Sequence, residues 1–396
     1  MNRTKRMALV AGALGALLAA CQLIVGVEQE ADTPRPEKAP PVLDAEPPDA
    51  DPCPHARPPG PPSSAGENAK ATTHTFAVRN VVVGGFDDLP STFDFDNRCS
   101  CQNRDTRDPN QPATSCIQAL PACTPTGNTD DERGADLGGQ GFVERFKATL
   151  ETFSKVELHD KFESGQRGIL VRLSEYNETE NDSSVTVAIL PSVGIFGRPD
   201  RAASRDAGVC EQYATAAQAP SWAGDAGDTW YRENKNVPVV TTTGYVVDGK
   251  LVVDSPATAY RLPIFGQYLE ESHPIFVANL SRPPGQAMNI RGNLVGITSA
   301  SKVLRLFGTF QDPLSLGKDA GICDNPTAVS VFTEAICNGR DLLELAKDPT
   351  APCDAFALAF GMEALEITEG PSSPDCPPQP TYPCDASCPP IDASGK

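Results

Sequence analysis

The chain has 396 residues, with 52 acidic and 33 basic side chains and a net charge of −19. A surface of this sign repels nucleic acid and anionic lipid headgroups, which excludes both as partners held by charge. Roughly 300 residues lie between two proline-rich ends, enough to bury a core as one large domain or two smaller ones.

Residues 1–20 have the features of a signal peptide. Arg3, Lys5 and Arg6 give a positive start, and residues 7–20 are all apolar or glycine. A helix over that apolar run spans roughly 21 Å, which is shorter than the ~30 Å hydrocarbon core of a bilayer. We therefore expect a cleaved signal peptide and not a transmembrane helix.

The signal ends in Leu18-Ala19-Ala20-Cys21, which resembles the lipobox of bacterial lipoproteins. The resemblance implies that Cys21 is acylated and becomes the first residue of the mature chain. Because Gln22 and not aspartate follows, the sorting rule of that family implies the outer membrane, with the chain facing the periplasm or the cell surface. Membrane lipid, bound through acylated Cys21, is then a predicted partner. The alternative is an ordinary signal peptide with an incidental cysteine.

Residues 21–73 are predicted to be the lipidated cysteine followed by a disordered tether. Twelve prolines lie from Pro34 to Pro62, and many acidic residues precede them or lie among them. Proline removes backbone donors and like charges repel, so this composition cannot offset the entropy lost on folding. We expect an extended, partly polyproline II segment with a reach of at most about 140 Å. A proline-rich docking motif for a partner is the alternative.

Residues 74–368 are predicted to form a disulfide-containing, β-rich domain. The clearest hairpin covers residues 245–253, because Asp248-Gly249 between two β-branched runs favours a type I′ turn. A second hairpin is predicted around the polar loop at 177–182. The other strand candidates are residues 74–83, 93–96, 169–174, 185–190, 260–264, 275–280, 288–297 and 303–310.

Helical patterns are fewer. Residues 142–153 are the best helix candidate, because apolar side chains recur there at three- and four-residue spacing. Short helices are expected over residues 329–336 and 341–346, while residues 356–367 are ambiguous between helix and strand. Successive strands with turns about every ten residues predict an antiparallel β-sandwich, jelly-roll-like, with a few short helices and Cys-rich loops. Residues 369–396 are predicted to be a Pro/Cys-rich C-terminal tail, stapled or disordered.

Twelve cysteines remain once Cys21 is set aside, an even number that favours disulfides in an exported chain. The pairing cannot be deduced from spacing. Zinc is the alternative, since Cys384 and Cys388 have a permissible ligand spacing, but no second such pair and no nearby histidine completes a tetrahedral set. Besides Cys53 and Cys210, the cysteines cluster as Cys99, Cys101, Cys116 and Cys123; Cys323, Cys337 and Cys353; and Cys376, Cys384 and Cys388.

Motifs for catalysis are weak. The spacing Gly244-x-x-x-x-Gly249-Lys250 matches part of a P-loop, but Leu251 follows where Ser or Thr is needed, and the glycine sits in a hairpin. The sequence contains neither H-E-x-x-H nor G-x-S-x-G. A catalytic triad assembled from distant residues would need a histidine as its base, and His55 is excluded because it lies in the tether. The other histidines are His74, His159 and His273, and for them a surface or core role is favoured.

Oxygen-rich loops are the remaining candidates. Oxygen ligands of the kind that Ca²⁺ binds occur at Asp94, Asp96 and Asn97, and again within residues 130–136. The spacing does not match an EF-hand, because with Asn128 as the first ligand Gly134 falls one position late. Solvated loop acids are favoured there, and equally at residues 177–182. Aromatic side chains in a Gly/Asp-rich stretch could stack on sugars, but a place in the core is favoured. These are Trp222, Trp230 and Tyr231.

Beyond the lipobox, three features are similar to a group of uncharacterised outer-membrane lipoproteins of myxobacterial type. They are the Pro/Asp tether, the Cys99-x-Cys101 loop that follows Phe-Asp-Phe-Asp, and Cys353-Asp-Ala-Phe. That group supplies no activity and no catalytic residues. The sequence thus predicts a lipid-anchored outer-membrane lipoprotein, a non-enzymatic binding or structural module for an unknown protein or glycan ligand, with neither cofactor nor metal. The alternative is an exported hydrolase acting on polysaccharide through a carboxylate pair, about 5–10 Å apart.

Overall fold

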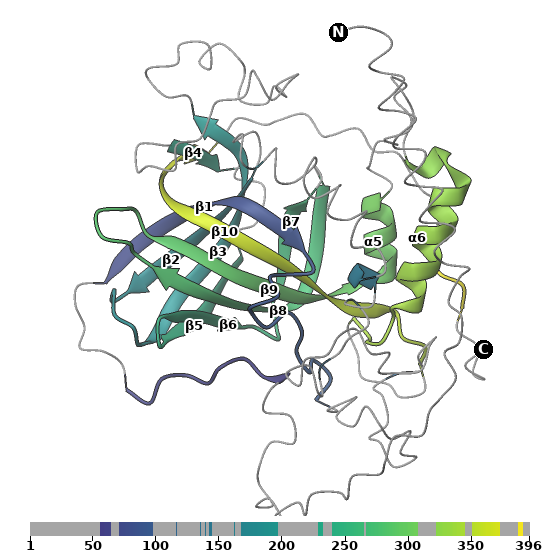
Figure 1. Cartoon of the computed structure of the whole chain (residues 1–396), viewed down its shortest axis with the longest axis horizontal. Helices are drawn as coiled ribbons and strands as arrows, with labels where there is room; N and C mark the ends of the chain where they lie inside the picture. Colours follow the sequence, from purple (N-terminus) through teal and green to yellow (C-terminus); the bar gives the residue numbers. More distant parts are fainter. Residues whose placement is uncertain are drawn as a thin grey trace, which may run out of the picture. The chain divides into compact units, whose positions relative to one another are not determined.

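The computed structural model describes stretches of the chain between Ala56 and Pro390 (Figure 1). They are residues 56–64, 71–97, 116, 135, 139, 142–144, 162, 168–196, 229–232, 240–264, 267–307, 322–344, 351–372 and 387–390. The strands are β1 (Thr72–Val83), β2 (Gly168–Tyr176), β3 (Asp182–Phe196), β4 (Thr229–Arg232), β5 (Val240–Val247), β6 (Lys250–Asp254), β7 (Ala259–Ile264), β8 (Gln267–Ser281), β9 (Asn289–Ser299) and β10 (Ala355–Ser372). The helices whose bounds the structure describes are α5 (Ala300–Phe307), the 3₁₀ turn η5 (Ile322–Asp324) and α6 (Pro326–Asn338), and residues 142–144 are helical as well.

Eight strands close into an antiparallel barrel. In the order β1, β2, β3, β5, β6, β8, β9, β10, each strand pairs with the next, and β10 pairs back with β1. The closing ladder runs from Thr75 opposite Ile367 to Val83 opposite Phe360. The mainly-β prediction is confirmed, but the jelly-roll-like sandwich is wrong. A closed barrel and a sandwich of two stacked sheets give the same alternation of inward and outward side chains along the sequence. The β1–β10 ladder is what distinguishes the barrel from the sandwich.

Two short strands add to this wall. β4 pairs antiparallel with the end of β3 and parallel with the end of β10. β7 pairs with the first residues of β8, from Ala259 opposite Ser272 to Ile264 opposite Gln267. Tyr260 of β7 belongs to the same buried cluster as the inward-facing side chains of the barrel. β7 therefore packs against the barrel interior.

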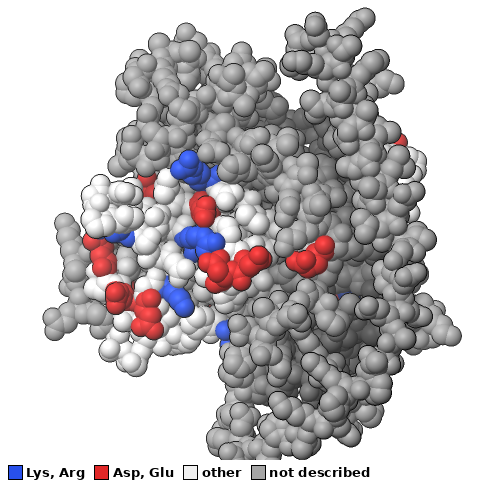
Figure 2. All heavy atoms as spheres, viewed as in Figure 1, with Lys and Arg blue, Asp and Glu red and all other residues white. Residues whose placement is uncertain are grey.

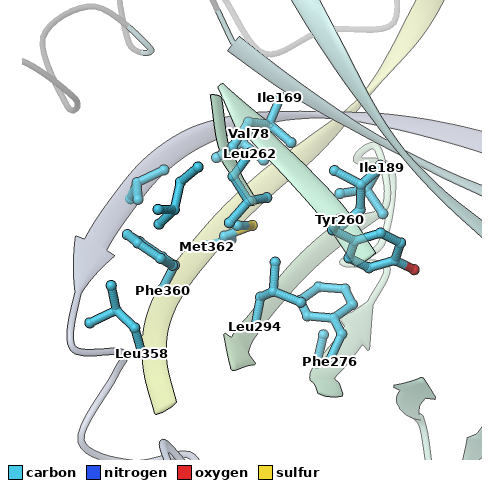
Figure 3. Packing of buried hydrophobic residues seen from close by; sticks show 14 of the residues in the cluster. Val78, Ile169, Ile189, Tyr260, Leu262, Phe276, Leu294, Leu358, Phe360 and Met362 are labelled. Atoms are coloured by element: carbon cyan, nitrogen blue, oxygen red, sulfur yellow. The ribbon is translucent and has the colours of Figure 1, made fainter. Parts of the chain in front are cut away.

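The barrel interior is lined by aliphatic and aromatic side chains from each of the eight strands. Figure 3 shows Phe276, Leu294 and Phe360, from β8, β9 and β10, in one group with Tyr260 and Leu262 of β7. None of these five side chains is more than 1% exposed. Full burial of a Leu or Phe side chain stabilises the fold by about 1.5–3 kcal/mol, so this cluster is the main source of stability.

A second apolar cluster lies where residues 84–97 cross the outer face of the barrel. Phe93 and Phe95 share it with Val277 and Val295. The strand expected at residues 93–96 is wrong. The alternation there directs both phenylalanines onto the barrel, but residues 91–97 form no strand.

Asn293 of β9 fastens this crossing segment. Its Nδ2 donates to the carbonyl oxygens of Phe86, Leu89 and Pro90, each at 3.1 Å, and its Oδ1 accepts from the Phe86 amide at 2.8 Å. The side chain is fully buried and bonded through both ends of its amide. Burying this polar group is therefore tolerated, because its hydrogen bonds replace those made with water.

Charges on the outside of the barrel pair with one another. The Arg291 guanidinium donates to both carboxylate oxygens of Asp88, at 2.7 and 2.8 Å, and to Glu363 at 3.1 Å, while lying 4.1 Å from the centre of the Phe86 ring. The hydrogen bond from Arg291 lowers the pKa of Asp88. Figure 2 shows acidic and basic side chains interspersed on the visible described face. We therefore assign these carboxylates a structural role.

Both predicted hairpins are confirmed. β5 and β6 are joined by Asp248 and Gly249, whose φ angles of 49° and 72° are those of the turn that the sequence predicts. β2 and β3 flank the polar loop at residues 177–181. Asn177 and Asp182 hold that loop from within, because Asn177 Oδ1 accepts from the Thr179 amide and Asp182 Oδ2 accepts from the Asn177 amide.

The helices differ in part from expectation. α6 confirms the helix over residues 329–336, but α5 occupies residues predicted as the strand 303–310, and residues 341–344 are not helical. The run Val-Leu-Arg-Leu-Phe at 303–307 is apolar except for one arginine, a composition that suits a buried strand as well as a helix. It is helical because Val303, Leu304 and Leu306 can then share one buried side. In the part of the chain that the structure describes, no helix is both long and apolar enough to cross a bilayer.

Disulfides are present, as the sequence predicts. Cys116 bonds to Cys353 across 237 residues, and Cys337 bonds to Cys388 across 51 residues. Each bond joins cysteines from two different sequence clusters, and neither bond joins two cysteines of the same cluster. The first fixes Cys116 beside the start of β10, and the second fixes Cys388 at the end of α6. Cys323 is also disulfide-bonded.

Candidate functional site

The candidate site is built around an irregularity in β8. Between Ser272 and Ile275 the β8–β9 register gains one residue on β8, and His273 adopts a φ of 47°. Such a bulge changes which residues of a strand face inward. Leu269 faces the interior before the bulge and Phe276 faces it afterwards, so both parts of the strand serve the same core.

Glu271 lies just before this bulge and points inward. It is opposite Tyr260 in the β7–β8 ladder, and residues directly opposite one another in a ladder share a face of the sheet. Its side chain is 0% exposed. An added Cβ at Gly296 of β9 would lie 2.6 Å from the Glu271 Cβ and 2.9 Å from Oε2. Glycine at 296 is therefore what leaves room for the carboxyl.

Neither carboxyl oxygen of Glu271 meets a hydrogen-bond donor among the residues that the structure describes. Burial raises the pKa of Glu271 well above its ordinary value, because the charged form loses its water and gains no partner. Burial thus favours the neutral carboxylic acid, which has one O–H donor and a carbonyl acceptor. An unsatisfied buried carboxyl destabilises the fold, and its presence calls for a functional reason.

Two neighbouring polar groups are bonded to each other. The hydroxyls of Tyr260 and Thr242 lie 2.6 Å apart and share a hydrogen bond. Burial raises the pKa of Tyr260 to about 12, although the bond to Thr242 works in the opposite direction. Tyr260 thus stays protonated across the physiological range. The interior therefore presents an apolar wall, one hydrogen-bonded hydroxyl pair and one carboxyl group without a partner among the described residues.

A second polar cluster lies where β1 begins and β10 nears its end. His74 Nδ1 is 2.6 Å from Glu366 Oε1, and His74 Nε2 is 3.1 Å from Glu178 Oε1. Glu178 also accepts from Arg282 at 3.3 Å, and Glu366 accepts from the Met288 amide at 3.0 Å. The cluster ties β1, β10 and the loops after β2 and β8 together.

The ionisation of this cluster does not suit glycoside hydrolysis. Desolvation is the largest single influence on Glu178 and opposes its charge, but the hydrogen bonds and positive charges of Arg282 and His74 together outweigh it and lower the pKa. For Glu366 desolvation is likewise the largest single influence, but the hydrogen bonds from His74 and the Met288 amide, together with the charges of His74 and Arg282, lower the pKa. A glycosidase needs one protonated and one ionised carboxyl. Both carboxyls here are held ionised, so this pair lacks the acid.

Several residues weighed from the sequence have structural surroundings. Asp94 is buried and pairs with Arg57, at 3.1 Å between Oδ2 and the guanidinium. His273 Nε2 lies 3.0 Å from Asp254 Oδ1, on the outside of the bulge. Gly244 sits in β5, away from any helix start. Among the described residues, no group of three His, Cys, Asp or Glu side chains could hold a metal ion.

Other sequence predictions fall on residues that the structure does not describe. Cys21, the predicted lipid attachment site, is one of them, and its acylation remains a prediction. Trp230 and Tyr231 lie in β4, but their side chains are not described. The other residues outside the described stretches are His55, Asn128, Asp130, Asp131, Glu132, Asp136, His159 and Trp222.

Sequence reasoning missed Glu271, although a signal was present. Glu270 and Glu271 are adjacent, and neighbouring residues of a strand point to opposite faces. Once β8 is extended back to Gln267, one of the two carboxyls must face inward. The strand prediction began at Ile275, beyond the bulge, and so did not include them.

No protein-family model, no curated protein and no solved structure matches this chain.

Proposed function

We propose that this protein is a lipid-anchored outer-membrane lipoprotein and that its barrel is a non-enzymatic binding module for a small, mainly apolar molecule. The anchor is supported by the positive start, the short apolar run and Leu18-Ala19-Ala20-Cys21, with Cys21 as the acylated residue. The disulfides agree with an oxidising compartment. The acid- and proline-rich residues that follow Cys21 would hold the barrel away from the membrane surface.

Glu271 is the observation that carries the binding function. An eight-stranded barrel is just wide enough to be filled by side chains or to hold one small ligand. An interior built only for stability would have an apolar side chain where Glu271 stands, since a buried carboxyl without a partner is destabilising. A glutamate at that position is explained by a bound molecule that supplies the missing partner.

The anchor predicts labelling at a single residue. In cells grown with labelled palmitate, the wild-type protein is expected to carry the label and Cys21→Ala to lose it, because the signal offers one acylated sulfur. The label is measured on the purified protein after gel electrophoresis. Label that persists in Cys21→Ala, or that is absent from the wild type, would show that the anchor is assigned wrongly.

The binding function predicts that toluene stabilises the protein. For residues 21–396 carrying Cys21→Ser, toluene near its solubility limit is expected to raise the melting temperature by about 2 °C, because a ligand that binds only the folded state stabilises it. Val331→Ala is the control, since Val331 is an exposed apolar side chain. The rise should be equal in this variant. An unchanged or lowered melting temperature in the parent protein contradicts interior binding.

A further inference from the structure

We infer that the carboxyl group of Glu271 is the hydrogen-bonding anchor of the barrel, and that the barrel selects neutral apolar molecules carrying one hydroxyl or carbonyl group. The inference rests on the proposed binding function and names the chemical class of its ligand.

The geometry directs the carboxyl toward the interior and leaves it free there. Glu271 shares a face with Tyr260, and its Cβ stands over the bare backbone of Gly296. Its two oxygens have no donor within reach among the described residues, and the Tyr260 hydroxyl is already bonded to Thr242. A ligand that reaches this carboxyl would supply its first hydrogen-bonding partner.

The surroundings favour a neutral ligand. Phe276, Leu294 and Leu262 belong to the apolar cluster that lines this interior. Full burial of the Glu271 side chain also favours its protonated form, which offers an O–H donor and a carbonyl acceptor without a charge. A hydroxyl can accept from the first and donate to the second. An ammonium ligand would have to lose its water to meet a group that is itself uncharged, which is unfavourable.

A buried water molecule is the competing occupant. A buried water makes 2–4 hydrogen bonds to otherwise unsatisfied polar groups. Near Glu271 the hydroxyls of Tyr260 and Thr242 are bonded to each other. That bond uses only one of the two hydroxyl protons, so it does not exclude a water at Glu271, and the probe comparison that follows distinguishes a water from a ligand.

Three probes of one shape test the inference: toluene, benzyl alcohol and benzylammonium. Dissociation constants are measured for residues 21–396 carrying Cys21→Ser, alone and with Glu271→Leu. The exposed Glu180 supplies the matched control, Glu180→Gln. Benzyl alcohol is expected to bind the parent about tenfold more tightly than toluene, because it adds a hydrogen bond to a buried unsatisfied group. Benzylammonium is expected to bind most weakly.

In Glu271→Leu the preference for benzyl alcohol should disappear while toluene still binds, and Glu180→Gln should behave as the parent. Equal binding of alcohol and toluene to the parent, a preference that survives in Glu271→Leu, or tightest binding of benzylammonium would overturn the inference. The first of these results is also the one expected if water alone occupies the carboxyl, and the second would mean that another polar group holds the alcohol. Failure of all probes to bind the parent would instead contradict the proposed function. Far-ultraviolet circular dichroism of each variant verifies that it is folded.

Discussion

Glu271→Leu is expected to be more stable than the parent protein at pH 4, where the carboxyl is protonated in both the folded and the unfolded chain, by about 1–3 kcal/mol in the free energy of unfolding. The carboxyl is fully buried, and neither of its oxygens has a partner among the described residues. Leucine removes these unsatisfied groups and keeps an apolar side chain against Gly296 and the surrounding core. The free energy is measured by urea unfolding with the disulfides intact.

Glu271→Gln is the matched comparison for this result. Glutamine has nearly the same shape and cannot ionise, but it still buries polar atoms without partners. Its stability should therefore fall between those of the parent and Glu271→Leu. A Glu271→Leu protein that is less stable than the parent would mean that the carboxyl makes a favourable contact in the folded chain, and the binding proposal would lose its main support.

Loss of the Cys116–Cys353 disulfide is expected to be the most destabilising change. The bond closes a loop of 237 residues, and the loop-entropy relation gives roughly 5 kcal/mol for such a length. Both cysteines are 1% exposed, so their replacement also disturbs packing. The double variant Cys116→Ala/Cys353→Ala, which leaves no free thiol from this pair, should unfold at a clearly lower urea concentration.

The second disulfide provides the comparison. Cys337→Ala/Cys388→Ala opens a loop of 51 residues, for which the same relation gives roughly 4 kcal/mol. The loss should therefore be somewhat smaller than for the first pair. An unchanged urea midpoint in the Cys116→Ala/Cys353→Ala variant would show that its long-range bond does not restrain the unfolded chain.

Local features of the fold could be predicted from the sequence because they depend on neighbouring residues. The turn at Asp248-Gly249 follows from the need for positive φ at both positions. The polar loop after β2 follows from its composition. Closure of the barrel depends instead on pairing β1 with β10, almost 300 residues along the chain, and no local pattern specifies that pairing. A sandwich was therefore an equally consistent interpretation of the same strands.

The candidate site shows the same limit. Sequence reasoning looked for recognisable motifs, and Glu271 belongs to none. Its importance comes from the β8 bulge at His273, from the missing side chain at Gly296 and from the opposite Tyr260, which come together only in the folded barrel. The paired acids Glu270 and Glu271 were the available sign, but the predicted strand began at Ile275, eight residues after β8 begins, and so left them out.

The pH dependence of stability in the parent and in Glu271→Gln tests the central claim most directly. The folded-state pKa of Glu271 is raised above that of the unfolded chain, so its contribution is fully present below the unfolded pKa and is lost as the pH rises toward the folded pKa. From about pH 4.5 upward, the stability of the parent relative to Glu271→Gln should fall by about 1.4 kcal/mol per pH unit. Curves that run parallel from about pH 4.5 to 7 would show that Glu271 ionises normally in the folded protein and would contradict the account.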